Sequence, residues 1–309
     1  MKSSTRRKHR LAGLDGAAFV LRRRGLVFSA SQVCLIVWLG LLSAPVAFSA
    51  LVRVVSQTVG SDELLLAVAG PSQIAALSHL ATDPSFSAVV NEAQPYPRVA
   101  LGGDAESILK FSPTIVLFAN YSRSELVEQV RRAHVQVIVF DRYATLDDAY
   151  GNLRLLAHAI GTDAKADKLI ADCRRRVATL EAKLRGVKPV RVIAPSIYAM
   201  IPGDQTTFQD LCDHAGAENL AATLGHLHGH MPPPSEQLLT WPIEQIVVAG
   251  DNLDDALAPF RSLPPYSLMS VVRENRAVLI APYQISCVSQ HRIDGYERLA
   301  KELHPEVFK

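Results

Sequence analysis

The chain has 309 residues, of which 49% are hydrophobic and 20% are charged, and its formal net charge is +2. The first fifty residues contain eight Lys or Arg and one acid, so they carry +7 and leave −5 for residues 51–309. That remainder has no excess of basic side chains for a nucleic-acid partner, and it is long enough for one large or two medium domains.

Residues 1–50 have the three parts of a secretory signal peptide. A basic start is followed by an uncharged apolar run over 33–42 and then by small residues such as Ser43, Ala44 and Ser49. The apolar run is shorter than the about 20 residues that a transmembrane helix needs. We predict a periplasmic protein exported by a signal peptide over 1–50, with the cleavage site open and an uncleaved membrane anchor as the alternative.

Residues 51–144 alternate between short apolar runs and helical segments. Residues 53–56 and 137–140 have the apolar pattern of buried strands. Residues 62–69 predict a helix with Ser61 as its N-cap and Gly70-Pro71 as its stop. This alternation predicts a first α/β lobe with a largely parallel sheet covered by helices.

Apolar residues then recur at helical spacing from Leu146 to Leu184, with no proline between them. We predict one long helix over 145–185 that divides the chain into two halves. Gly161 marks the position of a bend or a break in that helix.

Residues 186–309 predict a second α/β lobe, with strands over 190–194 and 277–280 and a closing helix over 296–303. One passage of the first lobe recurs here. Residues 106–109 and 113–117 form the first copy, and 236–239 and 242–248 form the second. Each copy is typical of a short helix, a proline and a buried strand. The repeat predicts two halves built alike, between which a ligand can bind.

Three cysteines remain after residue 50, namely Cys173, Cys212 and Cys287. Their spacing is neither that of a zinc site nor that of a redox Cys-x-x-Cys motif. A disulfide between Cys212 and Cys287 and three buried free thiols both stay open at this point. Phosphate-binding loops, nucleophile elbows and HExxH motifs are absent from the sequence.

Several stretches together resemble the substrate-binding proteins of ABC importers for ferric siderophores, cobalamin and haem. The matching stretches are 53–56, 62–69, 96–103, 106–117, 145–161, 215–221 and 235–248. The resemblance implies two Rossmann-like α/β lobes, 51–144 and 186–309, that are connected by a single long helix over 145–185.

The resemblance also implies a function. It predicts a monomeric periplasmic solute-binding protein without catalytic activity or cofactor. That protein would bind a ferric siderophore, cobalamin or haem and deliver it to an ABC permease and its ATPase. Which of these ligands is bound stays open.

Two glutamates match those with which this family docks onto its permease. Glu106 lies in the first half and Glu218 in the second. Two separated carboxylates would give an oriented, salt-sensitive contact with arginines of the permease. The internal repeat instead pairs Glu106 with Glu236, which is kept as a rival.

The ligand cleft is expected at the carboxyl ends of strands. Aromatic and amide side chains near these ends suit a large, partly apolar chelate or corrin ring. The candidates are Tyr96, Asn120, Tyr121, Tyr198, Met200, Gln205, Trp241, Tyr283 and Gln284.

Three histidines alternate in a proline-rich loop at His226, His228 and His230. Imidazoles at this spacing suit zinc, copper or haem iron, but no carboxylate accompanies them at a fixed spacing. We therefore predict no metal site, and expect His228 or His230 to face an anionic ligand. The alternative function is an exported metal-binding enzyme or haem-binding protein that uses this loop.

Overall fold

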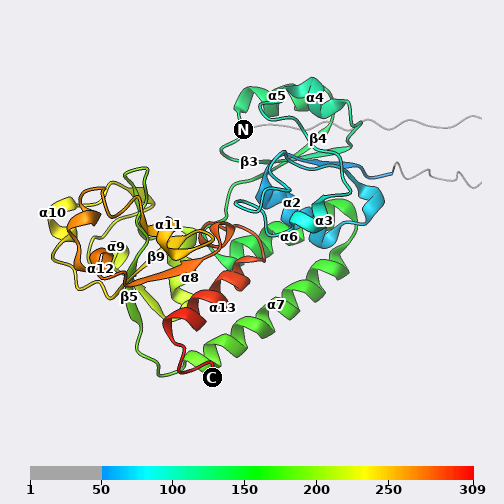
Figure 1. Ribbon diagram of the computed structural model, residues 1–309. Coiled ribbons are helices and arrows are strands. Elements are labelled where there is room, and N and C mark those ends of the chain that lie inside the picture. The colour runs from blue at the N-terminus through cyan, green and yellow to red at the C-terminus, as the bar shows by residue number, and fades with distance from the viewer. Residues whose placement is uncertain (1–50) are drawn as a thin grey trace, which may run out of the picture. The chain divides into compact units, whose positions relative to one another are not determined.

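The computed structural model describes residues 51–309, which contain two separate four-stranded parallel sheets (Figure 1). The predicted signal peptide lies outside the described residues. Within residues 51–309, none of the helices combines the length and the apolar character that crossing a membrane requires.

The first sheet has the strand order β2-β1-β3-β4. Val54 of β1 pairs with Ile115 of β3, which in turn pairs with Gln136 of β4. All five residues of β3 are buried, as the apolar sequence IVLFA predicts for a central parallel strand. The elements of this half are β1 (Val54–Ser56), α2 (Val59–Val68), η1 (Pro71–Gln73), β2 (Ile74–Ala76), α3 (Val90–Ala93), α4 (Ala105–Leu109), β3 (Ile115–Ala119), α5 (Ser124–Arg132) and β4 (Gln136–Phe140).

Helix α2 begins earlier than its sequence pattern indicates. The predicted N-cap, Ser61, is wrong, because Thr58 caps the helix and Ser61 is the third helical residue. The Thr58 hydroxyl accepts a hydrogen bond from the Ser61 backbone N–H, and the Ser61 hydroxyl accepts one from the Thr58 backbone N–H. This reciprocal capping box satisfies two backbone donors that would otherwise lack partners.

The single helix predicted over 145–185 is also wrong. The segment forms two helices, α6 (Leu146–Ile160) and α7 (Asp163–Leu184). Between them Gly161 has a φ of 74°, a left-handed conformation that glycine adopts without steric cost and that ends α6.

The two helices fold back on each other. The Arg154 side chain of α6 lies 3.8 Å from the Asp167 carboxylate of α7, and the Arg174 guanidinium lies 5.5 Å from the centre of the Tyr150 ring. These contacts join residues on both sides of Gly161 in antiparallel order. The connection between the two sheets is therefore a helical hairpin.

The second sheet has the order β10-β9-β5-β7, and β6 and β8 form a small antiparallel pair beside it. The elements of this half are β5 (Val190–Ile193), β6 (Ile201–Pro202), α8 (Thr207–Ala215), β7 (Ala217–Asn219), α9 (Leu220–Thr223), β8 (His230–Met231), α10 (Ser235–Leu238), β9 (Gln245–Ala249), α11 (Leu253–Leu257), η2 (Tyr266–Leu268), α12 (Ser270–Arg273), β10 (Ala277–Ile280), η3 (Pro282–Ile285) and α13 (Arg292–Leu303).

The two sheets have the same topology. Read from the opposite edge, the second sheet is β7-β5-β9-β10, which matches β2-β1-β3-β4 strand for strand in chain order. In this correspondence β3 and β9 are equivalent, as are β2 and β7. The strand order agrees with the internal repeat, because the repeated passage ends in β3 in the first half and in β9 in the second.

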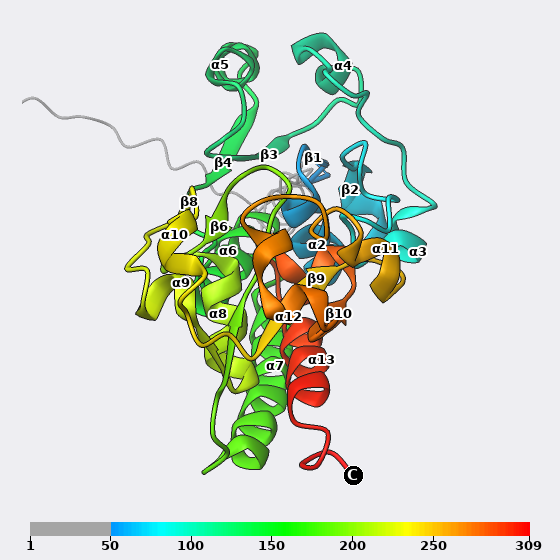
Figure 2. The same ribbon diagram turned by 60° about the vertical axis from the view of Figure 1, so that its left-hand side comes forward.

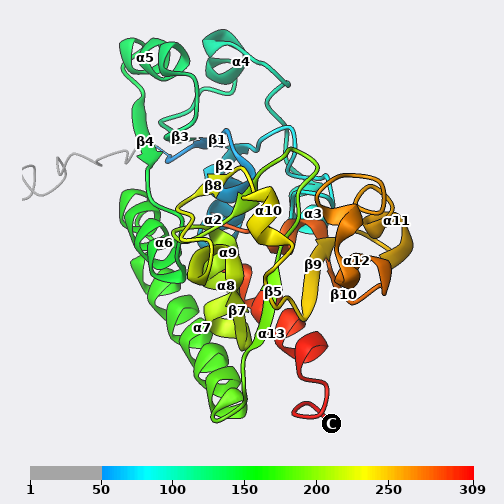
Figure 3. The ribbon, with the colours of Figure 1, turned by 90° about the vertical axis from the view of Figure 1, so that its left-hand side faces the viewer.

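One buried apolar cluster joins the two halves through the helical hairpin. It includes Leu117 of β3, Leu153 of α6, Ile170 of α7 and Val192 of β5. Helix α13 lies beside α7 (Figures 2 and 3), where Arg176 pairs with Asp294 at 2.7 Å. Residues 51–309 thus cluster as one unit, and the lobe boundaries at 144 and 185 stay predictions.

Candidate functional site

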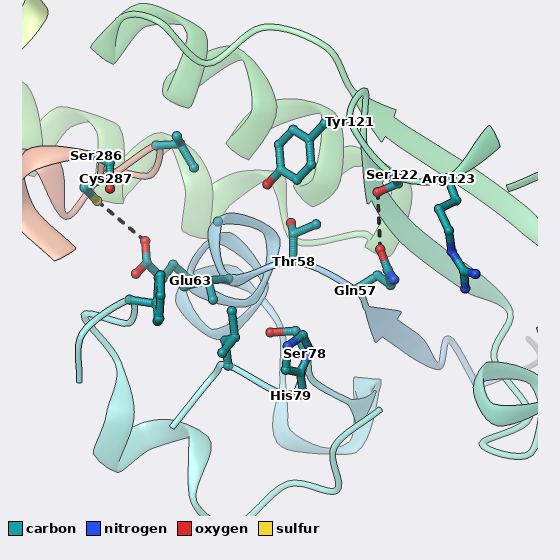
Figure 4. A pocket seen from close by; sticks show the side chains of 15 residues that line it. Gln57, Thr58, Glu63, Ser78, His79, Tyr121, Ser122, Arg123, Ser286 and Cys287 are labelled. Carbon is teal, nitrogen blue, oxygen red and sulfur yellow. Dashed lines mark hydrogen bonds between the residues drawn. The ribbon is translucent and has the colours of Figure 1, made fainter. Parts of the chain in front are cut away.

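A cavity of about 420 Å³ lies where loops of the two halves meet (Figure 4). Most of its wall comes from the first half and a smaller part from the second. The lining residues are Gln57, Thr58, Val59, Gly60, Glu63, Ser78, His79, Leu80, Phe86, Tyr121, Ser122 and Arg123, with Ser286, Cys287 and Val288 from the second half.

The topology of the first sheet brings these first-half residues together. Residues 57–60 follow β1 and open α2, Ser78 and His79 follow β2, and residues 121–123 follow β3. The strands β2, β1 and β3 are adjacent and parallel, so their carboxyl ends share one edge of the sheet. Ligands bind at this edge in open α/β sheets.

Hydrogen bonds fix the polar side chains at this edge. The Ser122 hydroxyl donates to Oε1 of Gln57 at 3.2 Å and accepts from the Ala119 backbone N–H at 3.1 Å. The carboxyl of Asp62 accepts from the backbone N–H and the hydroxyl of the lining residue Ser78 at 2.9 and 2.5 Å. The loops after β1, β2 and β3 are therefore held by side-chain contacts as well as by the sheet.

Two neighbouring carboxyls of α2, Asp62 and Glu63, are buried beside the cavity. Burial raises the pKa of Asp62 to about 7, against the opposing effect of its hydrogen bonds with Ser56 and Ser78. Burial also raises the pKa of Glu63. In contrast to these two buried carboxyls, His79 and Arg123 line the cavity with side chains that are exposed to solvent.

Two exposed aromatic rings line the cavity. The Tyr121 side chain is 67% exposed and meets Tyr143 edge to face, with 6.0 Å between ring centres. Phe86 is 55% exposed. Exposed rings in a cavity offer stacking surfaces for a flat or partly apolar ligand. Together with the guanidinium of Arg123 and the imidazole of His79, they suit a ligand that has both apolar and anionic groups.

Of the predicted ligand residues, Tyr121 lines this cavity. Asn120 is its neighbour in sequence, but the Asn120 amide oxygen is occupied by the Tyr143 hydroxyl, which donates to it at 2.7 Å. Tyr96 is partly buried against the core. These two side chains lie outside the cavity, and their role in ligand binding stays a prediction.

The predicted ligand residues of the second half also lie outside this cavity. Tyr198, Met200, Gln205 and the histidines are exposed around the β6–β8 pair, and Trp241 packs against the second-half core. Tyr283 and Gln284 lie in η3, directly before the cavity wall. The residues concerned are Tyr198, Met200, Gln205, His228, His230, Trp241, Tyr283 and Gln284, and they stay predictions.

The histidine loop has a carboxylate partner that its sequence spacing did not reveal. Nδ1 of His228 lies 3.4 Å from Oδ2 of Asp204 across the β6–β8 region. Within the part of the chain that the structure describes, no group of three or more His, Cys, Asp or Glu side chains is arranged to hold a metal ion.

The three cysteines of residues 51–309 are buried free thiols. Of the two alternatives left open by the sequence, the disulfide between Cys212 and Cys287 is wrong. Burial raises the pKa of both thiols, so they are poor nucleophiles at neutral pH.

The candidate docking glutamates occupy different settings. Glu106 is exposed in α4, directly before β3. Glu218 is partly buried in β7, where its carboxylate accepts a hydrogen bond from the Thr223 hydroxyl at 3.0 Å. The rival, Glu236, is exposed in α10, directly before β9.

Sequence reasoning missed most of the cavity. Thr58, Glu63, His79, Arg123 and Cys287 were not among the predicted ligand residues, although each lines it. The available signal was positional, since Thr58 and Arg123 follow predicted strands closely. The strand β2 has the sequence IAA, and alanine does not favour strands as the valines of β1 do, so His79 had no such signal.

Comparisons with known proteins agree with this architecture. A family model described as periplasmic binding protein matches residues 54–283. A curated relative is the uncharacterized ABC transporter substrate-binding lipoprotein YvrC of Bacillus subtilis (strain 168), with 20% identity over 215 residues and 67% of each chain covered.

Two solved structures are similar in fold. The periplasmic heme-binding protein RhuT from Roseiflexus sp. RS-1, in its apo form, has a TM-score of 0.71 and 18% identity, over 83% of this chain and 99% of that one. The periplasmic heme-binding protein HutB of Vibrio cholerae has a TM-score of 0.68 and 21% identity, over 82% of this chain and 99% of that one.

Proposed function

This chain belongs to the periplasmic binding protein family, and on that premise we propose that it is the solute-binding component of an ABC importer. It is exported by the leader over 1–50, captures its ligand in the cavity and delivers it to a permease with an ATPase. In this role it acts as a monomer and carries out no chemical reaction. Mass spectrometry of the mature amino terminus tests the export step.

The observation that carries the proposal is the composition of the cavity wall. Residues 57–60, 63, 78–80, 86 and 121–123 of the first half and residues 286–288 of the second line a common space of about 420 Å³. A ligand in this space contacts both halves, so its binding energy depends on how they are arranged. A binding protein signals occupancy to its transporter through such a dependence.

We propose an iron chelate or related metal complex as the ligand, with ferric siderophores, haem and cobalamin as the classes to test. The cavity volume lies within the range of roughly 300–1,000 Å³ that is usual for small-molecule sites. Tyr121 and Phe86 supply stacking surfaces, while Arg123 and His79 supply groups that attract carboxylate or catecholate oxygens. The heme-binding descriptions of RhuT and HutB support haem among these classes.

For docking on the permease, we propose Glu106 in the first half. The matching topology supports Glu236 rather than Glu218 as its counterpart in the second half. Glu106 lies nine residues before the start of β3, and Glu236 lies nine residues before the start of β9. Both are exposed, whereas the Glu218 carboxylate is engaged by Thr223. Free carboxylates at equivalent positions are the arrangement that a two-subunit permease would recognise.

Fluorescence titration tests the function directly. Trp241 is the sole tryptophan of residues 51–309. A bound ligand that absorbs light in the wavelength range of its emission quenches that emission. Haemin, cyanocobalamin, a ferric catecholate and a ferric hydroxamate are titrated separately into the mature protein. We expect one class to saturate the signal at a 1:1 ratio, and absence of binding by all four would rule out the proposed ligand class.

Two tyrosine variants then locate the site. Tyr121→Ala removes a ring that lines the cavity, and Tyr198→Ala removes an exposed ring outside it. We expect the Tyr121 variant to weaken binding of the active probe more than the Tyr198 variant. The reverse order would move the ligand from this cavity to the β6–β8 side of the second half.

A further inference from the structure

We propose that Glu63 and Arg292 are positioning residues that hold the second-half wall of the cavity from two sides. The wall, residues 286–288, belongs to the loop between η3 and α13. This loop has no strand or helix of its own, yet Cys287 is only 7% exposed and Ser289 is fully buried. A buried loop needs side-chain partners for its polar groups, and these partners then determine its position.

Glu63 holds the loop from the first half. Its Oε2 accepts a hydrogen bond from the Ser289 hydroxyl at 2.5 Å and lies 3.6 Å from Sγ of Cys287 (Figure 4). Its Oε1 accepts from the backbone N–H of Ala88 at 2.9 Å, on the first-half side. The backbone carbonyl of Glu63 also accepts from the Gln290 amide at 3.4 Å. One residue of α2 thus contacts three positions of the loop, Cys287, Ser289 and Gln290.

Arg292 holds the same loop from the second half. Its Nη2 donates to the carbonyl oxygen of Cys287 at 2.9 Å and to that of Tyr143 at 2.8 Å. Its Nη1 donates to the carbonyl oxygen of Ala144 at 3.1 Å and to Oδ2 of Asp210 at 2.7 Å. Only 3% of Arg292 is exposed, so these bonds form in a desolvated setting where charge-assisted bonds are strong.

The partners of Arg292 come from three parts of the chain. Tyr143 and Ala144 belong to the segment between β4 and α6, through which the chain leaves the first half. Asp210 belongs to α8 of the second half, and its Oδ1 accepts from the Leu146 backbone N–H, the first residue of α6. Arg292 therefore ties the cavity wall to the connection between the halves.

This arrangement has a consequence for ligand binding that rests on the proposed function. A ligand that displaces the wall moves the Cys287 carbonyl, and the guanidinium then carries the displacement to residues 143–146. The coupling is reciprocal, so the arrangement of the halves also sets the position of the wall. The planar guanidinium suits this role because its donors point in fixed directions toward the carbonyl groups of Cys287, Tyr143 and Ala144.

The test uses the thiol of Cys287 as a reporter of the wall and needs no ligand. The mature protein is treated with iodoacetamide at pH 8, and alkylation is followed peptide by peptide by mass spectrometry. Cys173, which is buried in α7 at 4% exposure, reports global opening in the same sample. Circular dichroism confirms that each variant is folded.

Two variants weaken the two supports. Arg292→Lys keeps a positive charge opposite Asp210 but removes the planar fork, and Ser289→Ala removes the hydroxyl that Glu63 binds. We expect Cys287 to react about tenfold faster or more in Arg292→Lys, and several-fold faster in Ser289→Ala, with Cys173 unchanged, because an exposed thiol forms the reactive thiolate more readily.

Arg276→Lys is the matched control. Arg276 also donates to a backbone carbonyl, that of Glu244 at 2.9 Å, but it does not contact the loop. If the effect is specific, Arg276→Lys leaves the rate at which iodoacetamide alkylates Cys287 at the wild-type value. An unchanged Cys287 rate in both test variants would overturn the proposal, as would equal acceleration of Cys287 and Cys173, which signals general loosening. Failure of the ligand titrations would not affect this result.

Discussion

The buried carboxyl of Asp62 makes the stability of the protein depend on pH in a direction that one substitution can isolate. Asp62 is fully buried in α2, and burial raises its pKa from the ordinary 3.8 to about 7. Between these two values the folded protein binds one proton more than the unfolded chain. The free energy of unfolding therefore falls as pH rises through this window, and the protonated form contributes its full stability only below pH 4 or so.

The size of the effect follows from the shift. Each pH unit inside the window changes the free energy of unfolding by about 1.4 kcal/mol. Going from pH 5 to pH 8 crosses roughly two units of the window, so ionisation of Asp62 lowers stability by about 2–3 kcal/mol. Asp62→Asn cannot ionise, and it keeps an oxygen that accepts from the Ser78 backbone N–H.

Urea unfolding of both proteins at pH 5, 6, 7 and 8 measures the effect. Other titrating groups cancel in the difference between variant and wild type. We expect the variant to gain about 2–3 kcal/mol relative to wild type across this range. Asp251→Asn, at an exposed carboxylate, is the control. For this variant we expect the difference in free energy of unfolding from wild type to stay constant with pH. A flat difference for Asp62→Asn as well would mean that its hydrogen bonds with Ser78 keep Asp62 ionised throughout, and the reasoning would be refuted.

Three further changes test the fold, the cavity and the docking surface. Gly161→Ala places a side chain at a φ of 74° and should lower stability by about 1 kcal/mol, seen as a lower thermal midpoint. Tyr121→Ala should raise the Kd of the active probe about tenfold through lost stacking, with unchanged thermal stability. Glu106→Ala with Glu236→Ala should abolish permease-coupled uptake while the Kd stays constant. Uptake lost on Glu218→Ala alone would instead restore Glu218 as the docking residue.

The broad architecture could be predicted because periodicity reports burial. The apolar run over 115–117 forms part of β3, and the helical spacing from Leu146 onward places residues in α6 and α7. The resemblance to substrate-binding proteins of ABC importers is confirmed by the family match over 54–283. These features depend on neighbouring residues, and local pattern is sufficient to identify them.

The fold-back at Gly161 could not be predicted in the same way. A glycine in a helical pattern permits either a bend or a complete reversal. The reversal is stabilised by apolar side chains of α6 and α7 that share one buried cluster, such as Leu153 and Ile170, and it brings Arg174 to the ring of Tyr150. The sequence marked the position of the break, but packing decided its geometry.

Residue types at short spacing are enough to predict the alternation of strands and helices, the duplicated halves and the family. The cavity, in contrast, depends on how distant parts of the chain pack together. Its two walls, at residues 57–63 and 286–288, are more than 200 residues apart, and Glu63 meets Ser289 because strand order and the helical hairpin bring them together. A contact between such distant segments is set by the packing of whole elements, which no local pattern encodes.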